Sequence, residues 1–197
     1  CSAELLSQLP PLFNNEDNTV QIKNLVLTFC KMSDEQFADY ILPLNCVDNL
    51  TLISVSSLSP KSLVTMSNSE IGKRLRVLDL SNAYAMASNK GIPAFDVFCS
   101  SMKNLTFLDL QNCNQLEPDD FKSLKHLINL VTLGLTQTRV SDEALAEVLP
   151  SLCNYYPKEG EQSGKLERLY LSYSPGVSTD TWNLLAALHI PPEGVSF

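Results

Sequence analysis

Two aspartates occupy the same local context in this sequence. Asp79 and Asp109 each stand between two leucines, in the tripeptide LDL. On neighbouring strands of a parallel sheet, the two carboxylates would lie about 5 Å apart. Such a pair can raise the pKa of one carboxyl group for acid–base chemistry, or can hold a cation between the two groups. The simpler interpretation is a polar ladder on the open side of a sheet. A metal-binding or enzymatic domain that uses Asp79 and Asp109 is the alternative.

The rest of the sequence offers few groups for catalysis. The only histidines are His126 and His189, and each stands in an apolar stretch typical of a helix. The motifs H-E-x-x-H, G-x-x-x-x-G-K-[ST] and G-x-S-x-G do not occur, and the six cysteines include no C-x-x-C pair. We therefore predict no catalytic residue, no metal ligand and no cofactor.

Leucine spacing marks the elements that would position the aspartates. In the stretch NLTFLDLQNC, Leu105, Leu108 and Leu110 stand at steps of three and two, and Cys113 follows three residues later. This spacing fits neither the 3.6-residue period of a helix nor the two-residue period of a plain strand. It recurs six times, with first positions at residues 22, 47, 75, 105, 130 and 166. We expect each copy to contain one short strand.

A helix is predicted to follow most of these strands. Ser33 and Ser141 each precede an aspartate and a glutamate, and Ser59 precedes Pro60. Serine is a favoured helix N-cap, and acids or proline suit the first turn. Apolar residues then recur at helical spacing: Phe37, Ile41 and Leu42; Leu145, Val148 and Leu149; Trp182, Leu185 and Leu188. One strand–turn–helix unit cannot bury its own apolar face, so we expect the units to stack into a curved solenoid.

Alternate strand residues must face away from the core, because side chains alternate along a strand. Tyr and Arg are enriched among residues that dominate binding energy. We therefore expect the strand that carries Tyr170 to be the centre of a protein contact, and the strand that carries Thr132 and Gly134 to be bland. Gly134 is expected to leave room beside Tyr170. The alternative is that the exposed rings pack against their lateral neighbours. The candidate partner-binding residues are Phe29, Asp79, Phe107, Asp109, Arg168, Tyr170 and Tyr173.

The repeated pattern resembles the leucine-rich repeat, L-x-x-L-x-L-x-x-N/C. The segments CKMSDEQF (Cys30–Phe37) and TRVSDEALAEVLPSLC (Thr138–Cys153) are similar to the cysteine-containing, ribonuclease-inhibitor-like subtype. The resemblance implies an α/β solenoid of six to seven repeats, with parallel strands on the concave face and helices on the convex face. It implies one domain over residues 1–197: an N-terminal helix or cap at 1–19, repeats at 20–190 and a C-terminal end at 191–197.

This subtype occurs in substrate-recruiting subunits of F-box ubiquitin ligases, and similar repeats occur in bacterial effectors. The resemblance therefore implies a non-catalytic module that binds a protein partner. We expect the contact to use the concave sheet and the rim formed by the insertion NYYPKEGEQSGK. An adaptor of a ubiquitin ligase and a secreted effector are the two settings considered.

Composition restricts the other partners. The net charge of −8 disfavours nucleic acid, which requires a basic surface. The apolar runs are shorter than the ~18 residues needed to span a membrane. The cysteines lack zinc spacing and suit an internal role, which favours reduced thiols over the alternative of a disulfide framework. Reduced thiols suggest a cytoplasmic protein, or the host cytosol for an effector. We expect a monomer.

Overall fold

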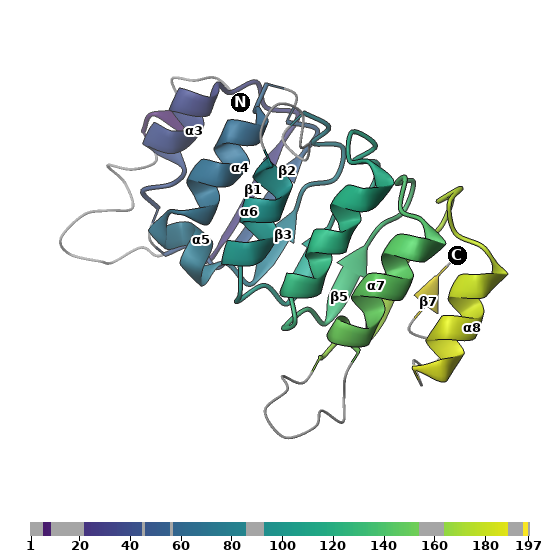
Figure 1. Ribbon diagram of the computed structural model, residues 1–197. Coiled ribbons are helices and arrows are strands. Elements are labelled where there is room, and N and C mark those ends of the chain that lie inside the picture. Colours follow the sequence, from purple (N-terminus) through teal and green to yellow (C-terminus); the bar gives the residue numbers. More distant parts are fainter. Residues whose placement is uncertain are drawn as a thin grey trace.

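The computed structural model describes residues 6–8, 22–44, 46–55, 57–85, 93–153, 164–188 and 195–196. The described part of the chain forms a parallel seven-stranded sheet whose strands lie side by side in sequence order (Figure 1). The strands are β1 (Asn24–Thr28), β2 (Asn49–Ile53), β3 (Val77–Asp79), β4 (Phe107–Asp109), β5 (Thr132–Gly134), β6 (Arg168–Tyr170) and β7 (Val195–Ser196).

Helices cover one face of this sheet and leave the other face open, as Figure 1 shows. They are α3 (Asp34–Tyr40), α4 (Pro60–Ser67), α5 (Glu70–Arg74), α6 (Ala94–Ser101), the 3-10 helix η1 (Pro118–His126), α7 (Asp142–Leu152) and α8 (Thr179–Ala187). The predicted α/β class with parallel strands is confirmed at this level. The strand surface opposite the helices is called the open face.

The core is a continuous stack of leucines between the sheet and the helices. The register pairs Leu50 with Leu78, Leu78 with Leu108, and Leu108 with Leu133. These four side chains are completely buried. The same register continues to Leu25 on one side and Leu169 on the other. Equivalent leucines therefore meet across every strand pair from β1 to β6, so each segment completes the core of its neighbours.

The predicted N-caps are confirmed, and they also join consecutive helices. Ser33, Ser59 and Ser141 each accept a hydrogen bond from a backbone N–H in the first turn of their own helix. Asp34 in the first turn of α3 accepts hydrogen bonds from the backbone N–H of Ser59, at 2.8 Å, and from the hydroxyl of Ser62. By accepting these bonds, the half-buried carboxylate of Asp34 fixes the start of α4 against the start of α3.

The same clamp recurs between α7 and α8. The carboxylate of Asp142 accepts hydrogen bonds from the Ser178 backbone N–H at 3.0 Å and hydroxyl at 2.6 Å. Partial burial acts to raise the pKa of Asp142, but the hydrogen bonds from Ser178 and Thr181 outweigh it, so the pKa lies below its usual range. The pKa of Asp34 is lowered in the same way: partial burial acts to raise it, but the hydrogen bonds from Ser59 and Ser62 outweigh this effect.

The residue that ends each predicted repeat pattern points inward. Cys30, Val55, Ala83, Cys113, Thr138 and Ser174 are all buried. The polar members are satisfied by strand-end carbonyls: the Cys113 thiol donates to Leu80 O at 3.1 Å, and the Thr138 hydroxyl donates to Leu135 O at 2.7 Å. Burial raises the pKa of Cys113 to about 12, so this thiol is protonated at neutral pH and is a poor nucleophile. The five cysteines in the described ranges are free and buried.

The helix layer includes one 3-10 helix, which starts at Pro118 and has a capping box formed by Glu117 and Asp120. One expectation about the helices needs correction. Trp182 was predicted to share a core stripe with Leu185, but it is 43% exposed, whereas Leu185 is buried. Because α8 is the last helix in the described part of the layer, its outer flank has no following helix to cover Trp182.

Several predicted regions lie wholly or largely outside the described residues. They are the cap at 1–19 apart from residues 6–8, the insertion at 154–165 apart from 164–165, the C-terminal end at 191–197 apart from 195–196, and His189. Across the described ranges, the structure contains no helix with the length and apolar character required to cross a membrane.

Leu110→Ala should lower the free energy of unfolding by about 2–5 kcal/mol, because the side chain is completely buried and the packed segments cannot collapse around the cavity. Urea unfolding measures the change. The exposed neighbour provides the control: Gln111→Ala should stay within about 0.5 kcal/mol of the parent. An unchanged urea midpoint for Leu110→Ala would contradict the inward direction of this position.

The aspartate clamps should make the fold sensitive to acid. The folded-state pKa values of Asp34 and Asp142 are lowered, so their stabilising contribution is complete above the unfolded pKa of about 3.9 and is lost as the pH falls through the folded pKa. Asp34→Asn and Asp142→Asn should therefore reduce stability at pH 7 and flatten its decline below pH 4. Asp39→Asn, an exposed change on the same helix as Asp34, is the control for urea unfolding over this pH range. Parallel pH profiles for all these variants would refute the clamp.

Candidate functional site

Large side chains on the open face gather at β6 and the turn that follows it. Arg168 and Tyr170 are two residues apart on β6, so both side chains leave the same face of the strand. Both are exposed, and 41% of Tyr170 is accessible to solvent. Tyr173 follows in the turn and is 84% exposed. Two phenol rings and a guanidinium are therefore presented within one short segment, as the sequence predicted.

A shallow apolar groove lies beside Tyr173. It has a volume of about 380 Å³ and is lined by Leu171, Tyr173, Ser174, Pro175 and Val177. Sequence reasoning missed the contribution of Pro175 and Val177. The signal was present in the pattern, because Pro175 directly follows the inward Ser174, and Val177 follows two residues later in the segment that leads to α8. We call Arg168, Tyr170, Tyr173 and this groove the β6 surface; it joins polar and aromatic groups to an apolar hollow.

Phe29 forms a separate exposed position at the other end of the sheet. It is 77% exposed, and Val26 on β1 is 62% exposed. The strand order places β2 to β5 between β1 and β6. The predicted binding residues are therefore divided into two groups, and Phe29 is not part of the β6 surface.

The strands between these groups are more enclosed than expected. Phe107 on β4 is half-buried and not fully exposed, and only 6% of Thr132 on β5 is accessible to solvent. Thr132 stands in register between Phe107 and Arg168, so two longer side chains flank it. Thr132 therefore offers little surface to a partner, although its strand position directs it away from the core.

The carboxylates of Asp79 and Asp109 are register partners on β3 and β4, as predicted. Each accepts a hydrogen bond from the backbone N–H two residues later, Asp79 from Ser81 and Asp109 from Gln111, both at 2.8 Å. These bonds close the turn at the end of each strand. Burial raises the pKa of Asp109, the Gln111 bond opposes this, and the nearby charge of Asp79 adds to the rise.

Gly134 does not leave a gap for Tyr170 or a partner. A Cβ placed on Gly134 would lie 2.4 Å from Oδ1 of Asp109. The glycine therefore makes room for the Asp109 carboxylate, and the expected vacancy beside Tyr170 is already filled. Gly134 also explains why Asp109 is more enclosed than an aspartate on an open strand would be.

Among the described residues, no group of three or more His, Cys, Asp or Glu side chains is arranged to hold a metal ion. The two aspartates already serve backbone N–H groups, so the geometry shows a structural use for each carboxylate. A polar ladder accounts for their positions.

Sequence reasoning also missed the backbone conformation of the exposed aromatics. The residue one position before the inward residue has a positive φ in six turns: Phe29, Ser54, Asn82, Asn112, Gln137 and Tyr173. Asparagine tolerates this left-handed conformation, whereas bulky residues are rare in it. Asn82 and Asn112 were the signal, because they mark the slot that Phe29 and Tyr173 share.

No protein-family model matches the chain, and no curated protein matches it. The functional interpretation therefore rests on the residues and their geometry.

Asp109→Asn should raise stability at pH 7. The raised pKa means that the folded state binds the proton more tightly than the unfolded chain, so stability falls as the pH rises from the unfolded pKa to the folded pKa. An uncharged amide avoids this cost, and its oxygen still accepts the Gln111 hydrogen bond. The urea midpoint should therefore exceed that of the parent at pH 7, with the difference shrinking toward pH 3.

Asp79→Asn is the comparison for this effect, because Asp79 is the register partner of Asp109 and adds to its raised pKa.

Calcium or magnesium added to the parent protein should leave its melting temperature unchanged. A rise in melting temperature with either ion, lost in both variants, would instead support the alternative metal site.

Proposed function

We propose that this chain is a leucine-rich-repeat solenoid of the cysteine-containing subtype. The support is the match between the sequence pattern and the register. Leucines of successive copies pair in order from β1 to β6, and the residue in the N/C slot of each copy is buried. On this interpretation the open face is the concave surface and the helices form the convex surface.

The function that this geometry supports best is non-catalytic binding of a protein partner. The observation that carries the proposal is the simultaneous exposure of Arg168, Tyr170 and Tyr173 beside an apolar groove. Aromatic rings bury large areas with few rotatable bonds, and Tyr and Arg are frequent among residues that dominate an interface. The β6 surface, defined as these three residues and the groove, is the proposed centre of contact.

The backbone at Tyr173 adds a second argument for this surface. Its φ of 58° is unfavourable for an aromatic residue; the same slot holds asparagine at two other turns, and Ser54, Gln137 and Phe29 at the remaining three. A highly exposed ring gives little packing energy in return. Conformational strain at an exposed side chain is found at binding sites more often than elsewhere. A partner that covers Tyr173 accounts for an aromatic residue in this position.

The two settings suggested by the resemblance remain the proposed contexts. In one, the module recruits a partner to a ubiquitin ligase in the cytoplasm; in the other, it is an effector that binds a protein in a host cytosol. The enzymatic alternative would have to use Asp79 and Asp109, and Oδ1 of each carboxylate already accepts a backbone hydrogen bond. The proposal therefore favours binding over catalysis.

The test begins with isolation of a partner and continues with binding titrations of variants. A photo-crosslinking amino acid at position 173 identifies proteins that touch the β6 surface. Tyr170→Ala and Tyr173→Ala should each weaken binding of the captured partner by about 2 kcal/mol or more, roughly thirtyfold. Circular dichroism and urea unfolding establish that each variant is folded.

Trp182→Ala is the matched control, because Trp182 has nearly the same exposure as Tyr170, 43% against 41%, but lies on a helix. It should bind like the parent. Tyr173→Asn is the sharpest variant: it should weaken binding yet raise the free energy of unfolding by about 1 kcal/mol, by relieving backbone strain. If both tyrosine variants bind like the parent and Trp182→Ala does not, the partner occupies the helical face and the proposal fails.

A further inference from the structure

A second, chemically different hollow lies at the edge of the sheet where the strands begin. It has a volume of about 560 Å³ and is lined by Asp48, Asn49, Lys73, Arg74, Arg76 and Asn104. Asp48 and Arg76 directly precede β2 and β3, and Lys73 and Arg74 end α5. We call it the basic groove. The groove lies where β2, β3 and β4 begin, and β5 stands between these strands and the β6 surface.

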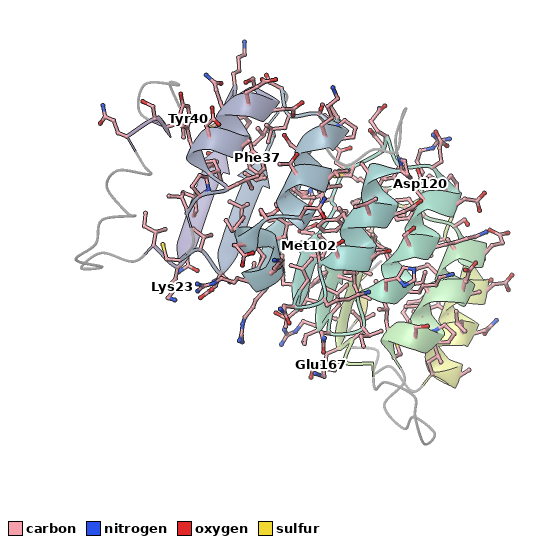
Figure 2. All side chains as sticks on the ribbon, turned by 60° about the vertical axis from the view of Figure 1, so that its left-hand side comes forward. Lys23, Phe37, Tyr40, Met102, Asp120 and Glu167 are labelled. Atoms are coloured by element: carbon pink, nitrogen blue, oxygen red, sulfur yellow. The ribbon has the colours of Figure 1, made fainter. Side chains whose placement is uncertain are left out.

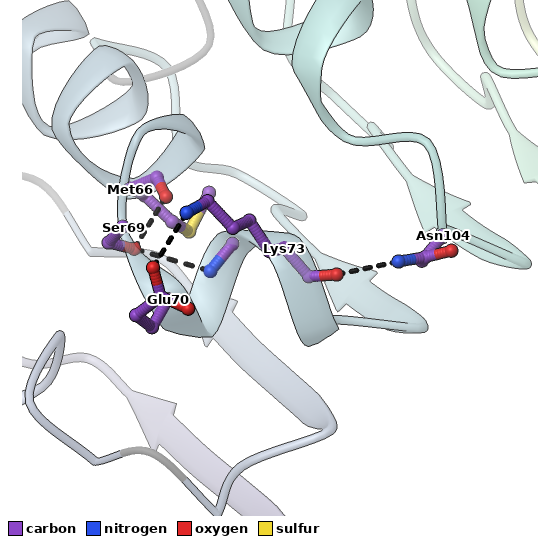
Figure 3. A network of polar contacts seen from close by, with 6 residues as sticks. Met66, Ser69, Glu70, Lys73 and Asn104 are labelled. Carbon is purple, nitrogen blue, oxygen red and sulfur yellow. Dashed lines mark hydrogen bonds and ion pairs between the residues drawn. The ribbon is translucent and has the colours of Figure 1, made fainter.

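The wall formed by α5 is held in place by polar contacts that Figure 3 shows. The Asn104 amide donates to the backbone carbonyl of Lys73 at 2.6 Å, which ties the end of α5 to the segment that leads into β4. At the start of α5, the Ser69 hydroxyl accepts from the Gly72 N–H at 3.2 Å. The Lys73 ammonium contacts Glu70 at 2.6 Å. The backbone around the groove is therefore well supported, while its cationic side chains remain accessible.

The cations of the groove are not equally neutralised. Arg74 contacts Asp48 at 3.1 Å, and Lys23 contacts the same carboxylate at 3.4 Å. Lys73 has Glu70 as its partner. Within the described ranges, the guanidinium of Arg76 has neither an ion pair nor a hydrogen bond, and the residue is exposed. One full positive charge and five N–H donors are therefore uncommitted.

Helix electrostatics explain part of this cluster but not all of it. Cations favour the C-terminal end of a helix, which accounts for Lys73 and Arg74 in the last turn of α5. Acids gather at the opposite edge, where helices start, as with Asp34, Asp142 and Glu143. In Figure 2, Lys23 and Glu167 lie at the lower edge of the molecule and Asp120 lies at the upper edge, so the lower edge carries charges of both signs. Arg76 follows Leu75, the C-cap of α5, so the macrodipole favours its charge as well. The macrodipole does not explain why Arg76 has no acidic partner within the described ranges, whereas Lys73 and Arg74 each have one.

The charge of the lining residues indicates which ligand fits. Lys73, Arg74 and Arg76 contribute three positive charges and Asp48 one negative charge, which leaves +2. Lys23 and Glu70, the neighbouring ion-pair partners, cancel one another and leave the sum unchanged. A phosphate monoester carries −1.5 to −2 at pH 7, whereas a carboxylate carries −1. Arginine also bonds phosphate oxygens through two parallel N–H groups.

We infer that the basic groove binds a phosphate monoester group, with the Arg76 guanidinium as its principal contact and Lys73 and Arg74 as supporting charges. The local excess of +2 stands out on a protein whose net charge is −8, so it attracts an anion against the overall field. The inference does not depend on the β6 surface, and either can fail without the other.

The test is an NMR titration of the full chain at constant ionic strength with inorganic phosphate, O-phosphoserine and acetate. Phosphate and phosphoserine should shift the amide signals of Asn49, Lys73 and Asn104, and acetate should bind at least about tenfold more weakly because it carries one charge. Tighter binding of phosphoserine than of phosphate would identify a phosphorylated residue as the source of the ligand. The reverse order would identify free phosphate, and both orders support the groove.

Arg76→Gln should weaken phosphate binding at least about tenfold, because a charge-assisted hydrogen bond is lost. It breaks no ion pair within the described residues, so the fold should persist, as circular dichroism would show. Lys31→Gln is the matched control, because it removes one exposed positive charge outside the groove. Three results would overturn the inference: equal affinity for acetate, equal loss in Arg76→Gln and Lys31→Gln, or phosphate shifts outside the groove only.

Discussion

The structure depends on the stacking of equivalent leucines across parallel strands. A strand of three to five residues followed by one helix has too little apolar surface to fold alone, so its leucines must be completed by those of the segments on either side. The register allows this from β1 to β6, because each leucine is paired with a leucine. Any shift of one residue would place these side chains on the open face and the polar ones inside.

The stacking makes demands at the two edges of the sheet. At the edge where strands end, the chain must turn toward the helix layer, and it does so through a residue with positive φ followed by a small inward residue. Inward hydroxyl and thiol groups are satisfied by strand-end carbonyls, as at Thr138 and Cys113. Two helices, α4 and α8, then begin with serine caps that are held by an aspartate of the preceding helix. Among the described helices, all except α4 carry an acid in the first turn, whereas only α5 and η1 carry bases in the last turn.

This division of charge and the open face leave two surfaces with different chemistry. The β6 surface offers aromatic rings and an apolar groove, which suit a folded protein partner. The basic groove offers an uncommitted guanidinium, which suits a small dianion. The central strands contribute less to recognition, because Asp109 fills the space over Gly134 and Thr132 is flanked by longer side chains. Binding is therefore proposed at the β6 surface and at the basic groove, and not on the central strands, where neighbouring side chains cover the sheet.

The sequence by itself determined the elements and the direction of their side chains. The spacing at Leu105, Leu108 and Leu110 specified a strand with one buried face, and Ser33 and Ser141 specified helix starts, because these features depend on residues close together in the chain. The pairing of Asp79 with Asp109 also followed from spacing. The exposure of Tyr170 and Tyr173 was predictable for the same reason.

Only the tertiary structure decided how the segments share space. The burial of Thr132, the carboxylate of Asp109 over Gly134 and the exposure of Trp182 depend on side chains from neighbouring strands or helices, which no single repeat pattern contains. The basic groove joins Asp48, Arg76 and Asn104, residues from three separate segments. Spacing within one segment sets which way a side chain points. What it meets there depends on the lateral neighbours that stacking brings beside it.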